Sequence, residues 1–426
     1  MLKNRRTLLA GLLLGGLALG GCELNLQDPN RPTEEEVFND PDGVQALAVG
    51  LQAVYSDEVR DPIWVNALLA DELGAGLNSF APYADLDAGR DITRGYYNTS
   101  AFDPWTGQYR VIKLADDLLR VAAEGPVPSE GTRSGMLALA RLYKAMALGN
   151  LIQLYESVPL DVGVNQPAPF QSRQVVLVEI LNLLESARSQ IQATPPSQVF
   201  NQQILAPGFS LQNTIDAMIA RYALIAGNNQ LAIQAAQRVS PSVLSTFQFS
   251  ATDPNPLWEL WYNSGNAYQM RPEQAFRLQA EAGDQRVAFW VRADTIRGAN
   301  ARLDELARYR ERTEAIPVYF PDEMKLIQAE AYARLGQLAE ARTALNAVRT
   351  QCTSALAEPV ACLPALTAAQ LPTAEAILAE VLRQRRYELY LQGLAYEDRR
   401  RLGATLKYPW ILVPQAECDR NPAATC

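Results

Sequence analysis

Apolar residues recur at helical spacing along most of the chain. In residues 42–55, Val44, Leu47, Leu51 and Val54 follow one another at intervals of three or four, which places them on one face of a helix. The hydrophobic pattern therefore predicts a protein built mainly of α-helices. Comparable patterns predict further helices at 63–73, 105–123, 136–155, 175–191, 211–226, 230–239, 322–335, 338–349 and 373–391.

Two of these helix pairs share a pattern of their own. In each pair the first helix ends at a glycine, Gly227 or Gly336, and an alanine, Ala232 or Ala341, follows five residues later, where a second helix must approach closely. The pattern resembles the tetratricopeptide repeat, whose helix pairs stack into a superhelix with a concave face. The alternative is two unrelated helical hairpins. We expect tetratricopeptide-like repeats that form a superhelical scaffold, with irregular loops and short β-strands inserted.

Two segments, 74–102 and 240–315, break the helical pattern and contain many aromatic and amide side chains. Long irregular segments on a regular frame are where binding residues usually lie. We therefore expect a ligand site in these segments. Short stretches with the composition of β-strands lie at 247–249, 257–262 and 287–291.

The N-terminus has the pattern of a secretory leader. Lys3, Arg5 and Arg6 precede an apolar run at 8–19, which is too short to cross a membrane, and Leu-Gly-Gly-Cys ends at Cys22. This ending resembles the bacterial lipobox, in which the cysteine is lipidated and becomes the first residue of the mature protein. The alternative is a leader cut beside an unmodified cysteine. The predicted divisions are a signal peptide at 1–21, a lipidated tether at 22–33 and one helical domain at 34–426.

Four cysteines remain after Cys22, an even number in a compartment that permits disulfides. Local pairing of Cys352 with Cys362 and of Cys418 with Cys426 is the simplest connectivity, and the other two connectivities stay open. A metal site is poorly supported, because the cysteine spacings match no zinc motif and the chain has no histidine. We expect no metal and no cofactor.

The composition excludes several functional classes. Without histidine, the chain cannot form a Ser-His-Asp triad or a zinc-binding HExxH motif. The formal charge of the 426 residues is −9, and loss of the three cations in the leader would leave about −12. An acidic chain of this kind offers no electrostatic footprint for nucleic acid, so we expect no nucleic-acid ligand.

Three further motifs follow in order along the chain. A long predicted helix at 141–155 is followed by VPL at 158–160, RQRRYEL at 383–389 precedes Gly393, Tyr396, Asp398 and Arg400, and VPQAE at 413–417 precedes NP at 421–422. Together they resemble the SusD/RagB-like family of outer-membrane nutrient-binding lipoproteins. Gln384 and Gln392 stand where the family pattern usually has Glu, and Cys418 replaces its common aliphatic residue.

The resemblance implies a lipid-anchored protein of the outer membrane that is exposed at the cell surface. Such a protein captures an oligosaccharide or a similar nutrient and passes it to a SusC-like TonB-dependent transporter. The resemblance also implies that the protein binds its ligand and does not catalyse a reaction. The alternative is a tetratricopeptide-type lipoprotein that acts as a scaffold in outer-membrane assembly or binds peptides, but this does not explain the C-terminal motifs.

Sugar rings stack on Tyr and Trp, and amide side chains bind sugar hydroxyls. If 257–262 is a strand, Trp258 and Trp261 point to opposite faces, so at most one of them can face a ligand. The alternative for each aromatic residue is packing beneath the loops. The candidate ligand-binding residues are Asn78, Tyr83, Tyr96, Tyr97, Asn98, Tyr262, Asn263, Asn266 and Tyr268, with Phe80 beside them.

The acidic residues offer little support for an enzyme. A glycoside hydrolase needs two carboxyl groups that face one sugar, and the available neighbours, Asp85 with Asp87 and Asp71 with Glu72, carry no flanking motif. The charges of the C-terminal motif are better explained as a structural network, in which pairs three residues apart, such as Arg385 with Glu388, can meet on one helix. We expect that the protein is not an enzyme.

Overall fold

The computed structural model describes residues 38–76, 79–90, 103–163, 167–263, 270–297, 302–424 and 426. Helices dominate these ranges, as the hydrophobic pattern predicts. The predicted signal peptide, the tether and Cys22 lie outside them.

The α-helices are α3 (Pro41–Glu58), α4 (Arg60–Leu69), α5 (Ala81–Asp87), α6 (Pro104–Glu124), α7 (Glu130–Leu154), α8 (Arg173–Ala193), α9 (Leu211–Ile225), α10 (Asn229–Arg238), α11 (Pro256–Trp258), α12 (Gln274–Leu278), α13 (Arg286–Trp290), α14 (Pro321–Arg334), α15 (Leu338–Arg349), α16 (Ala374–Glu388), α17 (Ala395–Arg401) and α18 (Gln415–Arg420). Two short π-helices, η2 (Phe200–Ile204) and η3 (Glu259–Asn263), accompany them.

The long helices begin at residues that satisfy their free backbone N–H groups. The side chains of Asp103, Ser129 and Thr373 each accept a hydrogen bond from an N–H in the first turn of α6, α7 and α16 respectively. Such caps stabilise a helix by about 1 kcal/mol each. The helix boundaries are thus largely local properties of the sequence.

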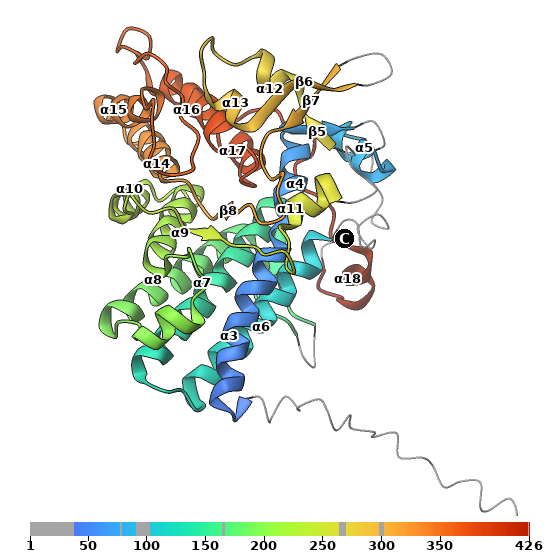
Figure 1. The fold of residues 1–426 in the computed structure, drawn as a ribbon, viewed down its shortest axis with the longest axis vertical. Helices are drawn as coiled ribbons and strands as arrows, with labels where there is room; N and C mark the ends of the chain where they lie inside the picture. Colours follow the sequence, from blue (N-terminus) through green and yellow to red (C-terminus); the bar gives the residue numbers. More distant parts are fainter. Residues whose placement is uncertain are drawn as a thin grey trace, which may run out of the picture.

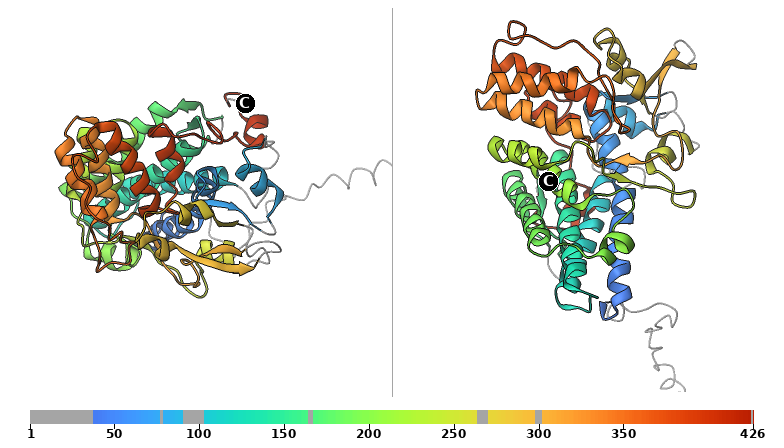
Figure 2. Two further views of the ribbon diagram at one scale, coloured as in Figure 1. Left: turned by 90° about the horizontal axis from the view of Figure 1, so that it is seen from above. Right: turned by 60° about the vertical axis from the view of Figure 1, so that its left-hand side comes forward.

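The helices pack in sequence order into a stack. Each of α6 to α9 packs against the next, α10 packs against α14, and α14 packs against both α15 and α16. Figure 1 and Figure 2 show this stack along one side of the molecule, while α5, α11 and the strands β5, β6 and β7 gather on the other. The stack is the scaffold, and the opposite side carries the irregular segments.

The two repeats form as predicted. Gly227 and Gly336 follow α9 and α14 with φ angles of 79° and 76°, a left-handed conformation that is easy for glycine. Ala232 and Ala341 are fully buried, so that α10 and α15 pack closely against the preceding helices. The tetratricopeptide-like pairing is confirmed.

The core is continuous along α7, which is covered on several sides. At Gly149 of α7, an added Cβ would lie 2.0 Å from the hydroxyl of Tyr222 on α9. The absence of a side chain at this position therefore allows α9 to place a buried tyrosine directly on α7.

Four antiparallel strand pairs join distant parts of the chain. The pair β1–β5 matters most here, because Leu73, Gly74 and Ala75 lie opposite Pro272, Arg271 and Met270. It brings together the two irregular segments in which the sequence predicts a ligand site. The strands are β1 (Leu73–Ala75) with β5 (Met270–Pro272), β2 (Ser157–Pro159) with β3 (Phe170–Ser172), β4 (Thr246–Phe247) with β8 (Ile316–Pro317), and β6 (Val291–Arg297) with β7 (Arg302–Leu306).

Three sequence expectations about these elements are wrong. Residues 257–262 are helical, because Asn255 caps the N–H groups of Leu257 and Trp258 and Pro256 favours a first helical turn. Residues 287–291 lie mostly in α13. The helix predicted at 63–73 ends at Leu69, since Asp71 has a φ angle of 54° and turns the chain into β1.

The structure pairs Cys352 with Cys362 and Cys418 with Cys426. This is the local connectivity among the three that four cysteines allow. Within the described ranges, no helix combines the length and the apolar character that crossing a bilayer requires.

Candidate ligand-binding site

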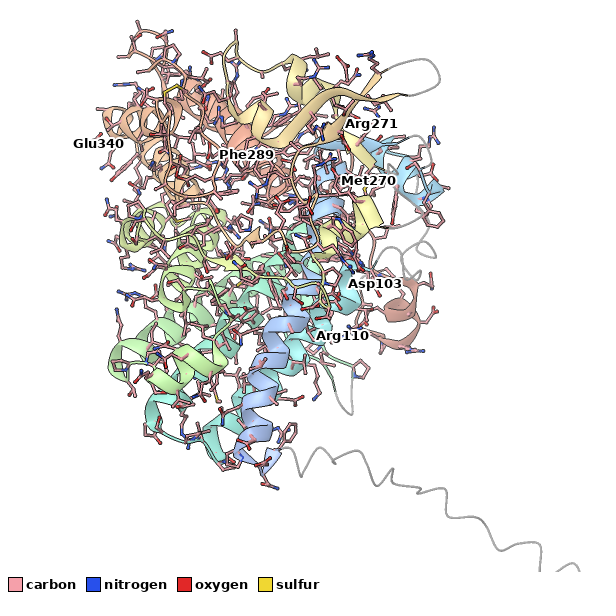
Figure 3. All side chains as sticks on the ribbon, in the orientation of Figure 1. Asp103, Arg110, Met270, Arg271, Phe289 and Glu340 are labelled. Carbon is pink, nitrogen blue, oxygen red and sulfur yellow. A yellow bond between two sulfur atoms is a disulfide. The ribbon has the colours of Figure 1, made fainter. Side chains whose placement is uncertain are left out.

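The strand β5 joins the two irregular segments at one edge of the molecule. It pairs with β1 and packs against β7, and Tyr262 of η3 reaches β7 through a hydrogen bond to Leu306. Figure 3 shows Met270 and Arg271 of β5 on the opposite side of the molecule from Glu340 of α15. We call the surface formed by α11, η3, β5, β7 and the arginines Arg310 and Arg312 the aromatic face.

On this face, aromatic rings are covered in part by arginine side chains. The Tyr262 hydroxyl donates to the Leu306 carbonyl at 2.8 Å, and the guanidinium of Arg310 lies 5.2 Å from the Tyr262 ring centre. Trp258 is half-buried, with the exposed Arg312 at 5.0 Å from its ring. Trp258 ends α11 and Tyr262 lies in η3, which follows directly. The two rings therefore come from consecutive helical turns and not from the alternating faces of a strand.

Trp261 lies deeper than its neighbours. Its side chain is 4% exposed, and its Nε1 has no hydrogen-bond partner. The hollow beside it has a volume of about 10 Å³, which is room for about one water molecule. A sugar would therefore have to lie on the aromatic face rather than inside it. The hollow is lined by Trp261, Tyr262, Met270, Arg271, Pro272, Glu305 and Leu306.

The structure places Tyr83 in the core. Its side chain is 4% exposed, and its ring packs edge-on against Trp64 at 4.7 Å and against Phe80 at 5.7 Å. The reason is α5, a short helix that begins beside Pro82 and that the sequence pattern did not predict. The burial argues against a ligand contact for Tyr83, whereas its neighbour Phe80 is 40% exposed.

Most of the other predicted ligand-binding residues lie outside the part of the chain that the structure describes. Asn263 is the last residue of η3. The remaining ones lie outside the described residues and stay predictions, and they are Asn78, Tyr96, Tyr97, Asn98, Asn266 and Tyr268.

A larger cavity, of about 610 Å³, lies where the end of α4 meets α12, α16 and α17. We call it the arginine cavity, because Arg383, Arg385, Arg386 and Arg399 contribute to its walls. Sequence reasoning missed it, since its residues come from segments more than 300 positions apart. The other lining residues are Ala70, Asp71, Glu72, Glu273, Ala275, Gln279, Ala379, Leu382, Tyr387, Leu389, Ala395, Asp398 and Ala404.

Two of the cavity's carboxylates are each paired with two cations. Asp398 accepts from Arg385 at 2.7 Å and from Arg401 at 2.6 Å, and Asp71 pairs with Arg399 and Lys407. Burial by itself would raise the pKa of Asp398, but the two arginines outweigh burial and hold that pKa below its usual value. These pairs fix α17 against α16 and against the segment after α4.

Glu72 is the exception among these acids. It is 1% exposed, its Oε2 accepts from the Leu391 N–H at 3.2 Å, and its Oε1 has no hydrogen-bond partner. Burial raises the pKa of Glu72 to about 8, against the lowering effect of that backbone hydrogen bond. At neutral pH most molecules therefore carry a neutral carboxylic acid here.

Comparison with known proteins agrees with this architecture. Residues 307–417, which include α14 to α17, match the model of the SusD family. This part of the chain is similar to the SusD family. None of the curated proteins matches the chain.

Solved structures extend the likeness of this SusD-like fold to nearly the whole chain. A SusD superfamily protein from Bacteroides thetaiotaomicron has a TM-score of 0.70 at 16% identity, covering 90% of this chain and 98% of the other. One from Bacteroides vulgatus has a TM-score of 0.71 at 14% identity, covering 91% and 98%. The surface glycan-binding protein A from Bacteroides uniformis has a TM-score of 0.68 at 18% identity, covering 91% and 99%.

The SusD-like C-terminal motif forms a buried polar network, although the pair expected within it is wrong. Arg385 binds Asp398 of α17, whereas Glu388 binds Arg286 of α13 at 3.2 Å. Arg286 also binds Asp284, and all three side chains of that second group are at most 1% exposed. Partners from other elements replace the partner on the same helix because each charge is buried and needs a fixed counter-charge.

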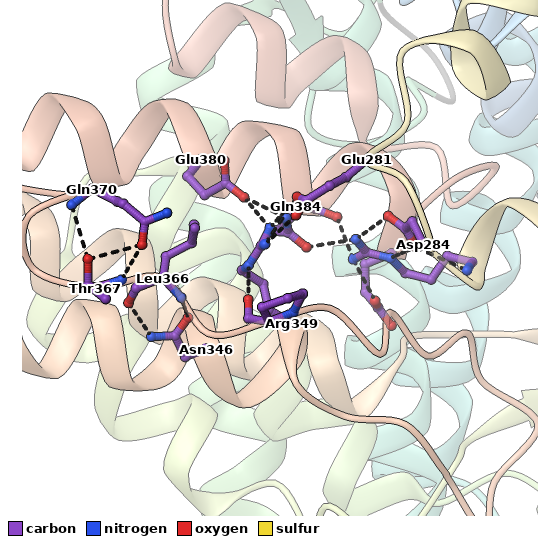
Figure 4. A network of polar contacts seen from close by, with 12 residues as sticks. Glu281, Asp284, Asn346, Arg349, Leu366, Thr367, Gln370, Glu380 and Gln384 are labelled. Carbon is purple, nitrogen blue, oxygen red and sulfur yellow. Dashed lines mark hydrogen bonds and ion pairs between the residues drawn. The ribbon is translucent and has the colours of Figure 1, made fainter.

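The same network accounts for Gln384. Its amide oxygen accepts from Arg286 at 2.7 Å, and its amide nitrogen donates to Glu380 at 2.6 Å. Figure 4 shows how Glu380 then meets Arg349 of α15, which also binds Glu281. A glutamate at 384 would lack the N–H and would place a second carboxylate against Glu380. The amide is the side chain that joins the two ion-pair groups.

The carboxylates considered for catalysis are held by structural partners. Asp87 accepts from the Ala75 N–H and from Lys407, both at 2.9 Å, and Asp85 pairs with Arg90 on the surface. In the described part of the chain, no group of three or more acidic or cysteine side chains is arranged to hold a metal ion.

Proposed function

We propose that this protein is a surface lipoprotein that captures an oligosaccharide or a similar nutrient and delivers it to a SusC-like TonB-dependent transporter of the outer membrane. The observation that carries the proposal is the β1–β5 pair, which joins the two irregular segments beside Tyr262. The SusD-like fold and its likeness to a surface glycan-binding protein support it.

The aromatic face suits a ligand that must be held and then released. Trp258 and Tyr262 offer partly exposed rings for the apolar faces of sugars, while Arg310 and Arg312 offer donors to hydroxyls beside them. An open surface of this kind buries less of the ligand than an enclosed pocket. The face therefore favours moderate affinity for an extended ligand.

Binding can be tested with the tyrosines of both irregular segments. A panel of oligosaccharides is first screened, and the tightest ligand is then titrated against Tyr96→Ala, Tyr97→Ala, Tyr262→Ala and Tyr268→Ala. A contact residue should weaken binding by about 1 kcal/mol or more while the melting temperature changes little. Tyr143→Ala is the control for burial, since Tyr143 is fully buried and its truncation should cost about 3–5 kcal/mol of stability. Unchanged affinity in all four variants would place the ligand elsewhere.

The anchor and the partner need separate tests. Cys22→Ser should abolish lipid labelling and release the protein from membranes, because one lipidated cysteine is the proposed anchor. Retention of the unlabelled variant in the membrane would contradict the proposed lipid anchor.

The partner is tested by purification from native membranes in mild detergent. Copurification with a TonB-dependent transporter would support delivery of the nutrient to that transporter, and failure to copurify would count against it.

A further inference from the structure

The arginine cavity has the size and construction of a small-molecule site. Its volume of about 610 Å³ lies within the range of ligand pockets in proteins, which is roughly 300 to 1,000 Å³. Its walls include buried residues such as Glu72, Arg385 and Leu389, whereas Gln279 and Arg383 are exposed. The cavity thus has a buried wall and a rim that is open to solvent.

The charges in the walls do not balance within the protein. Asp71 and Asp398 are each satisfied by two cations, one of which lies outside the lining. Arg383 and Arg386, by contrast, have no carboxylate partner among the described residues, and Arg386 donates only to the amide oxygen of Gln279, at 2.8 Å. Glu273 forms no ion pair with any described residue, and the cations whose charges act on it are Arg271 and Lys407, so Arg383 and Arg386 are not neutralised by it.

Glu72 adds to this imbalance. With its pKa raised to about 8 by burial, it contributes no full negative charge to the wall at neutral pH. The lining then holds four arginines against the carboxylates of Asp71, Glu273 and Asp398, which leaves one net positive charge. This charge matches a monoanion better than a dianion, because Glu273 and Asp398 would repel the second negative charge.

Two buried polar atoms in the wall have no hydrogen-bond partner among the described residues. Arg385 donates from its Nε to Asp398, but no described residue accepts from its buried Nη1, and Glu72 Oε1 also has no described partner. An unsatisfied buried donor costs about 1–3 kcal/mol, so these two atoms add to the uncompensated polarity of the wall, although neither is open to the cavity. Arg383 is exposed and Arg386 is half-buried, and a carboxylate held by these two side chains would supply acceptors in the planar geometry that guanidinium groups match.

We propose that the arginine cavity is a second ligand site, separate from the aromatic face, which binds a small carboxylate-bearing molecule such as an acidic monosaccharide. Arg383 and Arg386 hold the carboxylate, and Gln279 and Glu273 face the hydroxyl or amine groups of the same molecule. Ala275, Leu382 and Tyr387 supply the apolar part of the wall. The proposal concerns a site that the glycan-binding function does not require.

The test is calorimetric titration of the full-length protein in detergent at neutral pH, with D-galacturonate, L-glutamate, D-galactose and inorganic phosphate as probes. At least one carboxylate should bind, and galactose should bind at least tenfold more weakly than galacturonate. Arg383→Gln and Arg386→Gln should each weaken carboxylate binding tenfold or more while the melting temperature is unchanged, because neither arginine has an ion pair to lose. Arg420→Gln, which removes an exposed arginine of α18, is the matched control and should bind as the unmodified protein does.

Three results of the titrations would overturn the proposal, and a fourth comes from a variant of the aromatic face. The first is the failure of both carboxylates to bind, and the second is unchanged binding in Arg386→Gln. The third is phosphate binding more tightly than both carboxylates, which would make the cavity a phosphate site. Tyr262→Ala separates this test from that of the proposed function. It should leave carboxylate binding intact, and loss of binding in that variant would place the ligand on the aromatic face instead.

Discussion

Arginine side chains are prominent in both the arginine cavity and the aromatic face, but their surroundings differ. In the cavity wall, Arg385 is 3% exposed and is fixed by a carboxylate of another helix. On the aromatic face, Arg312 is exposed and lies over Trp258 without an ion pair among the described residues. A buried charge must keep its partner because water cannot replace it, whereas an exposed charge is solvated in any position. The first arrangement fixes the fold, and the second leaves a surface free to rearrange around a ligand.

The largest expected effect comes from breaking the buried arrangement. Asp398→Ala removes the ion-pair partner of the buried Arg385 and leaves Arg401 with Glu330 alone, so it should lower the free energy of unfolding by about 3–5 kcal/mol. Chemical denaturation measures this. Lys113→Ala, which removes the surface pair with Asp117, should cost less than ~1 kcal/mol. Equal losses in the two variants would remove the distinction between buried and exposed charges.

The next effect is a pH dependence that belongs to Glu72. Its pKa is raised from an ordinary 4.5 to about 8 by burial, so the folded state binds the proton more tightly than the unfolded chain. The stability that this proton contributes is fully present below about pH 4.5 and is lost as the pH rises through 8, at roughly 1.4 kcal/mol per pH unit. Glu72→Gln should remove that slope relative to the unmodified protein between pH 5 and 8. Parallel stability curves would show that Glu72 is ionised in the folded state.

A smaller effect is expected from Gln384→Glu. The new carboxylate loses the N–H that donates to Glu380 and faces it at close range, although Arg286 and Arg349 limit the repulsion. The expected cost at pH 7 is about 1–3 kcal/mol, decreasing at low pH as one carboxyl is protonated. Gln392→Glu is the matched control, since among the described residues no carboxylate accepts a hydrogen bond from its amide, which donates a long 3.4 Å bond to the Leu391 carbonyl. A larger loss for Gln392→Glu would contradict the bridging role of Gln384.

The smallest effect is expected on the aromatic face. Arg312→Gln removes one exposed cation–π contact and should change the free energy of unfolding by at most about 0.5–1 kcal/mol. Thermal unfolding measures the stability, and titration with the selected oligosaccharide measures binding in the same variant. A loss of stability comparable to that of Asp398→Ala would mean that the face is part of the structural network.

Local signals in the sequence predicted the scaffold well. Gly227 and Gly336 end their helices where the repeat pattern places them, and the helix caps and apolar spacing act over only a few residues. Local rules failed where two of them competed. At 257–262, the aromatic composition favoured a strand, but the capping side chain of Asn255 and Pro256 started a helix. At Tyr83, the unpredicted helix α5 turned the ring inward.

The sequence by itself determined the positions of the long scaffold helices and that the cysteines could pair locally, because helix periodicity, capping and short loop closure depend on neighbours in the chain. Only the tertiary structure decided that Arg385 binds Asp398 rather than Glu388, that β1 meets β5, and that Glu72 lines a cavity with α16 and α17. The reason is that burial and the choice of a charge's partner depend on segments that are distant in sequence, and no local pattern encodes which of those segments will meet.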